Sequence, residues 1–98
     1  MATVAPQMYR NFVNGEWVEA RSGQTMPSIN PATGDVLGMV PKAGREDVAA
    51  AVAAAAAAYR SWRKVPAPRR AEILYRAAEA LVRQKEDLAR LMTRELGK

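Results

Sequence analysis

The stretch Asn11-Phe12-Val13-Asn14-Gly15-Glu16-Trp17-Val18 carries the clearest structural signal in the chain. A type I′ turn requires a positive φ at both of its central residues, and Asn-Gly meets that requirement at the lowest cost. The flanking residues include the β-branched and aromatic types that are enriched in strands. The stretch therefore predicts a β-hairpin over residues 9–20.

A second hairpin is predicted after the first, so that residues 9–40 form two hairpins. Ser28-Ile29-Asn30 leads into the turn Pro31-Ala32-Thr33-Gly34, and Asp35 to Val40 form the returning strand. Proline fixes φ at the first turn position, and a glycine can adopt the left-handed conformation that closes such a turn with a bulge. We expect residues 21–25 to form a loop and residues 1–8 to be a flexible start.

Two amphipathic helices are predicted after residue 41. The first covers residues 45–64, where Ala49 to Ala58 are alanine except for Val52, and alanine has the highest helix propensity. Prolines 66 and 68 end this helix and begin the second over residues 67–96, since proline suits the first helical position. Gly97 is expected to cap the second helix. Apolar residues recur at the helical period, namely Val48, Val52, Ala55, Tyr59 and Trp62 on the first helix and Leu74, Ala78, Leu81, Leu88 and Met92 on the second.

The composition excludes several kinds of chemistry. The 98 residues include no Cys and no His, which excludes disulfides, thiolate nucleophiles, Ser-His-Asp triads and the usual zinc and haem ligands. Val, Leu, Ile and Phe together number 18 of 98 residues, below the roughly 20% at which a chain runs short of core material. We therefore expect the chain to be incomplete as a domain and to pack against more protein.

The net charge is +5, and 11 of the 15 basic residues are arginine. A basic balance can indicate nucleic-acid binding, but most of these residues alternate with acidic ones, as on solvated helix faces. Nucleic-acid binding is therefore the weaker interpretation. The sequence has no apolar run long enough to span a membrane and no secretory signal pattern at its start. Together with the lack of Cys, this favours a cytoplasmic location.

Few motifs point to a site. Neither GxGxxG nor GxxxxGK[ST] occurs, so no phosphate-binding glycine loop is predicted. Three glutamates of the second helix have an arginine four residues later, which predicts surface ion pairs rather than paired catalytic acids. The polar residues of the second turn could expose oxygens to a monovalent cation or bond to their own turn backbone. The predicted ion pairs are Glu72–Arg76, Glu79–Arg83 and Glu86–Arg90, and the polar turn residues are Ser28, Asn30 and Thr33.

Taken together, six blocks of sequence resemble the N-terminal region of the NAD(P)-dependent aldehyde dehydrogenase superfamily. The resemblance covers residues 9–98, with the blocks in the family's order and spacing. The blocks are Phe12-Val13-Asn14-Gly15-Glu16-Trp17-Val18, Ile29-Asn30-Pro31-Ala32-Thr33-Gly34-Asp35-Val36, Glu46-Asp47-Val48 with Ala51-Val52, Trp62, Arg70 with Ile73-Leu74, and Glu95-Leu96-Gly97-Lys98.

The resemblance implies an α/β fold in which this chain is part of the nucleotide-binding domain. Full-length members are several times longer, form dimers or tetramers, and oxidise aldehydes to acids or acyl-CoA with NAD or NADP. Their Cys nucleophile, Glu base and cofactor contacts lie beyond the position of Lys98, so no catalytic or cofactor-binding residue is expected here. In several members K⁺ or Na⁺ binds near the residues that match Ser28 and Ile29, which implies at most half of a cation site.

Two interpretations of the protein's function follow, one as part of an enzyme and one as an interaction module. The first is the N-terminal part of an aldehyde dehydrogenase, which would be inactive alone because thiolate attack requires a thiol. The second is a small helical interaction module without enzymatic activity, which would bind a partner or a second copy through the face that carries Leu74, Leu81 and Leu88. The module would unfold cooperatively as an isolated chain, whereas the fragment would not.

Overall fold

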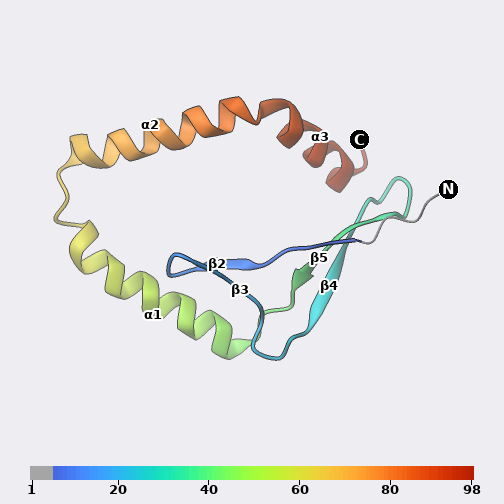
Figure 1. Cartoon of the computed structure of the whole chain (residues 1–98), viewed down its shortest axis with the longest axis horizontal. Coiled ribbons are helices and arrows are strands. Elements are labelled where there is room, and N and C mark those ends of the chain that lie inside the picture. Colours follow the sequence, from blue (N-terminus) through green and yellow to red (C-terminus); the bar gives the residue numbers. More distant parts are fainter. Residues whose placement is uncertain (1–5) are drawn as a thin grey trace.

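A computed structural model of the chain describes residues 6–98 and contains five short strands followed by three helices (Figure 1). The predicted order of strands and then helices is confirmed. The elements are β1 (Gln7–Met8), β2 (Asn11–Val13), β3 (Glu16–Val18), β4 (Thr25–Ile29), β5 (Val36–Pro41), α1 (Arg45–Trp62), α2 (Ala67–Arg83) and α3 (Lys85–Leu96).

The first hairpin forms as predicted. β2 and β3 are antiparallel, and Phe12 lies opposite Trp17 with the two ring centroids 4.9 Å apart. Asn14 and Gly15 have φ values of 52° and 78°, as a type I′ turn requires. Both aromatic rings stay exposed, so the pair stabilises the hairpin locally without forming a core.

The second hairpin belongs to a three-stranded sheet with the order β1–β5–β4. β4 pairs with β5 from Thr25 onward, in part of the predicted loop, and the register shifts between Ser28 and Ile29. The predicted glycine of the turn, Gly34, has a φ of 82°. The turn is closed by hydrogen bonds from the N–H groups of residues 33 and 34 to the Asn30 carbonyl oxygen.

β1 was not predicted. It lies parallel to β5, with Gln7 opposite Gly38 and Met8 opposite Met39. The prediction of a flexible start over residues 1–8 is therefore wrong for these two residues, and the first five residues lie outside the described part of the chain. A two-residue strand has almost no local signal, because its stability comes from a partner strand far away in the sequence.

The single helix predicted over residues 67–96 is interrupted at Gln84. This residue has φ −105° and ψ 13° and lies between α2 and α3. Its N–H group donates to the Leu81 carbonyl at 3.1 Å, while its own carbonyl accepts from Leu88 at 2.9 Å. Glu86 and Asp87 follow in the first turn of α3, where acidic residues favour a helix start. The first helix is also slightly shorter than predicted and ends at Trp62.

The ion pairs on the helices differ from the predicted ones. Among residues 6–98, the pairs within helices join Arg69 to Glu72 at 3.1 Å and Arg90 to Asp87 at 3.8 Å, both at a spacing of three residues. None of the three predicted pairs forms in this part of the chain. Glu72 and Arg90 have other partners, and Glu79 and Arg83 are not joined to each other. Spacings of three and four both bring side chains together on a helix, so sequence spacing alone does not select the partner.

The helices form an open arc rather than a packed bundle (Figure 1). α1 and α2 meet at a corner, and α3 leads back toward the strands. At this end Gly97, with a φ of 75°, caps α3 as predicted and lies against the second turn. A methyl group at position 97 would lie 2.8 Å from Pro31 Cγ and 3.1 Å from the Ala32 nitrogen, so the contact leaves no space for a side chain.

Within residues 6–98, the buried apolar side chains are those of Ala20 and Pro41, and none of the three helices buries a residue. Leu74 and Leu81 on α2 remain 67% and 60% exposed. Fully burying a leucine stabilises a protein by about 1.5–3 kcal/mol. These helices gain little of that stabilisation, because their apolar side chains stay exposed. In the described part of the chain, no helix is both long and apolar enough to cross a membrane.

Candidate functional site

The longest-range hydrogen bonds made by side chains join the loop after the first hairpin to the start of α1. We call this the loop–helix junction, made by Arg21, Gly44, Glu46 and Asp47. The Asp47 carboxylate accepts hydrogen bonds from the Gly44 N–H at 2.8 Å and the Arg21 N–H at 3.1 Å. The Arg21 guanidinium also lies 3.2 Å from Glu46. The junction fixes the direction in which α1 leaves the sheet.

The electrostatics of this junction favour the charged form of Asp47. The hydrogen bond from Gly44, the second bond from Arg21, and the positive charge of Arg21 together lower the pKa of the carboxyl below its ordinary value of 3.8. Asp47 occupies the third position of α1, from which a side chain can reach back to the N-cap N–H. The sequence indicated Asp47 only as part of the block Glu46-Asp47-Val48, and the bond to Arg21 had no sequence signal.

The lowered pKa predicts an acid-labile junction. Since the pKa is lower in the folded state, the stabilisation is fully present above the unfolded value and is lost as the pH falls through the folded value. In an NMR titration, the amide protons of Arg21 and Gly44 should shift together with a midpoint below 3.8. Asp47→Asn should abolish the shared transition. A midpoint at or above the ordinary value would contradict this assignment.

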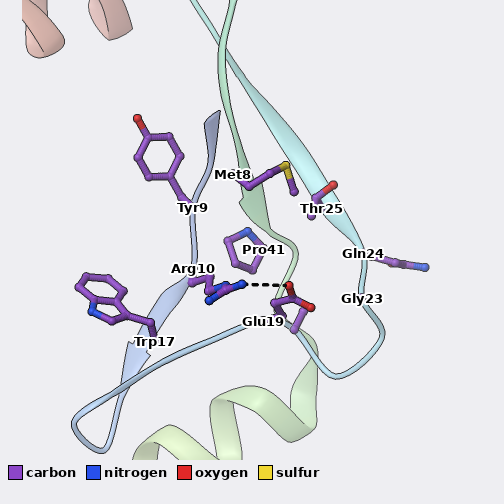
Figure 2. Close-up of a pocket in the computed structure, with 10 residues that line it drawn as sticks. Met8, Tyr9, Arg10, Trp17, Glu19, Gly23, Gln24, Thr25 and Pro41 are labelled. Atoms are coloured by element: carbon purple, nitrogen blue, oxygen red, sulfur yellow. Dashed lines mark ion pairs between the residues drawn. The ribbon is translucent and has the colours of Figure 1, made fainter. Parts of the chain in front are cut away.

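A hollow of about 500 Å³ lies between the first strands and the loop after β3 (Figure 2). Tyr9 and Trp17 stand on one side of it, and Arg10 lies 3.9 Å from Glu19 across it. Both charged side chains are more than half exposed, so this ion pair is worth little. The hollow carries no arrangement of nucleophile and base.

A larger hollow of about 720 Å³ lies between the β2–β3 hairpin and α1. Its lining is mostly apolar, with Phe12, Val13 and Val18 on the hairpin side and Val48 and Val52 on the helix. An open apolar hollow beside an uncovered helix is typical of a packing surface rather than of a catalytic site.

Ser28 and Ile29 lie at the end of β4, where the register shifts before the turn. Within the turn itself, the Asn30 Oδ1 accepts from the Ala32 N–H at 2.9 Å, and the Thr33 hydroxyl donates to Asp35 at 2.9 Å. These turn oxygens are therefore engaged by the turn. Among the described residues, no group of three or more acidic, His or Cys side chains could hold a metal ion. The cation site stays a prediction based on resemblance.

A further surface feature is the uncovered apolar side of α2. We call it the α2 docking face, and it consists of Leu74, Ala77, Ala78 and Leu81. These residues recur at about 3.6 residues per turn and therefore share one side of the helix. The sequence predicted this stripe, and the structure shows that nothing within residues 6–98 buries it.

Comparison with known proteins identifies the chain. A family model described as the aldehyde dehydrogenase family matches residues 17–98. Malonate-semialdehyde dehydrogenase 2 of Geobacillus kaustophilus is 50% identical over 96 residues, which cover 98% of this chain and 20% of that protein. The chain thus spans about a fifth of the length of this relative.

Solved structures agree with the sequence match. An NADP-dependent enzyme of E. coli superposes with a TM-score of 0.89 at 42% identity, covering 94% of this chain and 19% of that one. An NAD-dependent aldehyde dehydrogenase of Sinorhizobium meliloti gives a TM-score of 0.90 at 32% identity, covering 96% and 19%. The chain belongs to the aldehyde dehydrogenase family, and it corresponds to the N-terminal region of that fold.

Proposed function

We propose that this chain supplies the opening hairpins and first helices of an NAD(P)-dependent aldehyde dehydrogenase that oxidises an aldehyde to an acid or acyl-CoA. The observation that carries the proposal is the family match over residues 17–98, which includes helices whose apolar sides are uncovered. In this role the chain supports the remainder of the fold and contributes no reacting group.

The proposed role is structural because the chain has no group suited to the family's chemistry. Thiolate attack on an aldehyde requires a Cys, and the chain has none. The ionisable groups of the loop–helix junction hold backbone N–H groups and one another. We therefore infer that the isolated chain neither oxidises aldehydes nor binds NAD or NADP.

For the assembled enzyme we propose malonate semialdehyde as the substrate, because the Geobacillus relative carries that name. The cofactor is NAD or NADP, since the structural neighbours include enzymes that depend on each. We further propose that the assembled enzyme is a dimer or tetramer. Ser28 and Ile29 would contribute backbone carbonyls to a K⁺ or Na⁺ site completed by other parts of the fold, supported by the disturbed strand pairing at this point.

A reassembly assay tests the proposed function. The purified chain is mixed with the complementary segment, meaning the part of the Geobacillus relative that this chain does not match. Each part alone should leave NAD or NADP unreduced with malonate semialdehyde, whereas the mixture should produce NADH or NADPH. Cofactor reduction by the chain alone, or an absence of binding between the two parts, would contradict the proposal.

A matched pair of variants makes the assay specific for the α2 docking face. Leu81→Asp places a charge within that face and should reduce reassembled activity at least tenfold, because an unpaired buried charge is costly. Arg76→Gln changes a residue on the opposite side of the same helix and should leave activity within about twofold, as is usual for surface substitutions. Equal losses in both variants would mean that the face has no special role.

A further inference from the structure

Arg70 stands out among the charged residues because part of its guanidinium is already buried without a partner. Within residues 6–98, Arg70 Nε is the buried side-chain polar atom that has no hydrogen-bond partner. Buried polar atoms in folded proteins are nearly always paired. An orphaned donor in an otherwise open structure therefore indicates that its acceptor comes from outside the described chain.

The position of Arg70 on α2 shows where that acceptor must come from. Residues 70, 74, 77 and 81 fall on one side of a helix with 3.6 residues per turn, so Arg70 extends the α2 docking face toward the start of the helix. Arg69, by contrast, lies about 100° further round the helix, off this face, and pairs with Glu72 in solvent. The two neighbouring arginines thus have different surroundings.

The charge of the surrounding corner defines the chemistry of the partner. From Tyr59 in the last turn of α1 to Ala71 near the start of α2, the chain carries five basic residues and no acidic one. A guanidinium stays protonated at all accessible pH values, so covering the docking face would bury a positive charge. A buried charge must be paired, and a carboxylate matches both the charge and the planar donor geometry of arginine.

We propose that Arg70 is the polar anchor of the α2 docking face, and that its guanidinium binds a carboxylate of the remaining four fifths of the aldehyde dehydrogenase fold. This inference rests on the proposed function. Apolar residues of the face would supply most of the contact area, while the single charged pair would fix the register in which the two parts meet. Arg70 is a positioning residue and does not touch the reacting atoms.

Reassembly with the complementary segment tests this assignment, with Arg69→Gln as the matched control. Arg70→Gln should weaken binding of the two parts by about thirtyfold or more, because removal of one member of a buried charge pair leaves the other unpaired. Arg69→Gln removes an exposed pair and should change binding by no more than about threefold. Equal effects of the two substitutions would overturn the proposal.

A second variant and a direct probe separate a specific bond from general loss of folding. Arg70→Lys keeps the charge but lacks the Nε donor, so it should not restore binding; full restoration would overturn the proposal. When the wild-type parts bind, NMR should show that solvent exchange of the Arg70 guanidinium protons slows relative to the isolated chain, while exchange of the Arg69 guanidinium protons is unchanged. An exchange rate for Arg70 equal to that of Arg69 would also overturn it.

The outcomes distinguish this inference from the proposed function. If wild-type parts do not bind, the proposed function fails first. If they bind and are active but Arg70→Gln behaves like Arg69→Gln, only the anchor fails. The chain could instead bind a second copy of itself, or DNA, in a way that depends on Arg70. Either result without binding of the segment would mean that the α2 docking face has another occupant, and would overturn the proposal.

Discussion

Heating the isolated chain should produce a broad, gradual loss of helical circular dichroism without a cooperative step. Cooperative unfolding requires a core whose contacts are lost together. In residues 6–98 only Ala20 and Pro41 are buried apolar side chains, and no helix buries a residue. Each helix should therefore melt by its own local equilibrium, with alanine-rich α1 retaining the most helix.

The dimensions of the molecule lead to the same expectation. Its radius of gyration is 17.2 Å, compared with about 13 Å for a compact chain of 100 residues. Its accessible surface is 8462 Å², compared with about 5,500 Å² for a folded monomer of this mass. The excess surface includes the apolar faces of all three helices, so the isolated chain should also bind a hydrophobic dye strongly.

The complementary segment provides the control for the melting experiment. Once bound, the chain should unfold together with the segment in a single sharp transition, and dye binding should decrease. A sharp, concentration-independent transition of the chain alone would contradict the prediction and favour the interaction-module hypothesis. A sharp transition that depends on concentration would point to a homo-oligomer formed through the same apolar faces.

The elements that the sequence predicted well are those determined by local chemistry. Asn14 and Gly15 form the expected turn because few other residues adopt positive φ without strain. The prolines at 66 and 68 separate α1 from α2 because proline cannot occupy a helix interior. Gly97 ends α3 for the same type of local reason. In each case the deciding interactions lie within a few residues of one another.

The elements that the sequence missed depend on distant or competing interactions. β1 exists because it pairs with β5, and a two-residue strand has no periodicity to detect. The interruption at Gln84 was hidden because the apolar stripe continues across it from Leu81 to Leu88. Local preferences for a new helix start at Glu86 and Asp87 prevailed over that continuous pattern.

In the candidate site, too, the sequence predicted the features set by local periodicity and missed those set by distant contacts. The docking face could be read from the spacing of Leu74 and Leu81, since amphipathic periodicity is a strong signal. The partnership of Asp47 with Arg21 joins segments that are 26 residues apart, and no sequence pattern indicates it. The orphaned Nε of Arg70 likewise required atomic burial to be recognised.

Substituting Gly38 with valine should detach β1 from the sheet in the assembled protein. Gly38 is buried in β5, with Gln7 opposite it on one side and Ser28 on the other. A Cβ atom at this position would collide with the Tyr9 ring and lie 3.0 Å from the Gln7 carbonyl oxygen. The ring could move, but the backbone oxygen can move only together with the strand.

The Gly38→Val substitution should destabilise the pairing of β1 with β5, because overpacking of this kind typically costs about 1–3 kcal/mol. The Tyr9 N–H donates to the Met39 carbonyl at 2.9 Å, and its hydrogen exchange in the reassembled complex should become roughly tenfold faster or more. Gly44→Ala is the matched control, since its Cβ would lie an ordinary 3.8 Å from Asp47 Oδ2 at a φ of −100°. Unchanged protection of Tyr9 in the valine variant would show that β1 is held by something other than its close approach to β5.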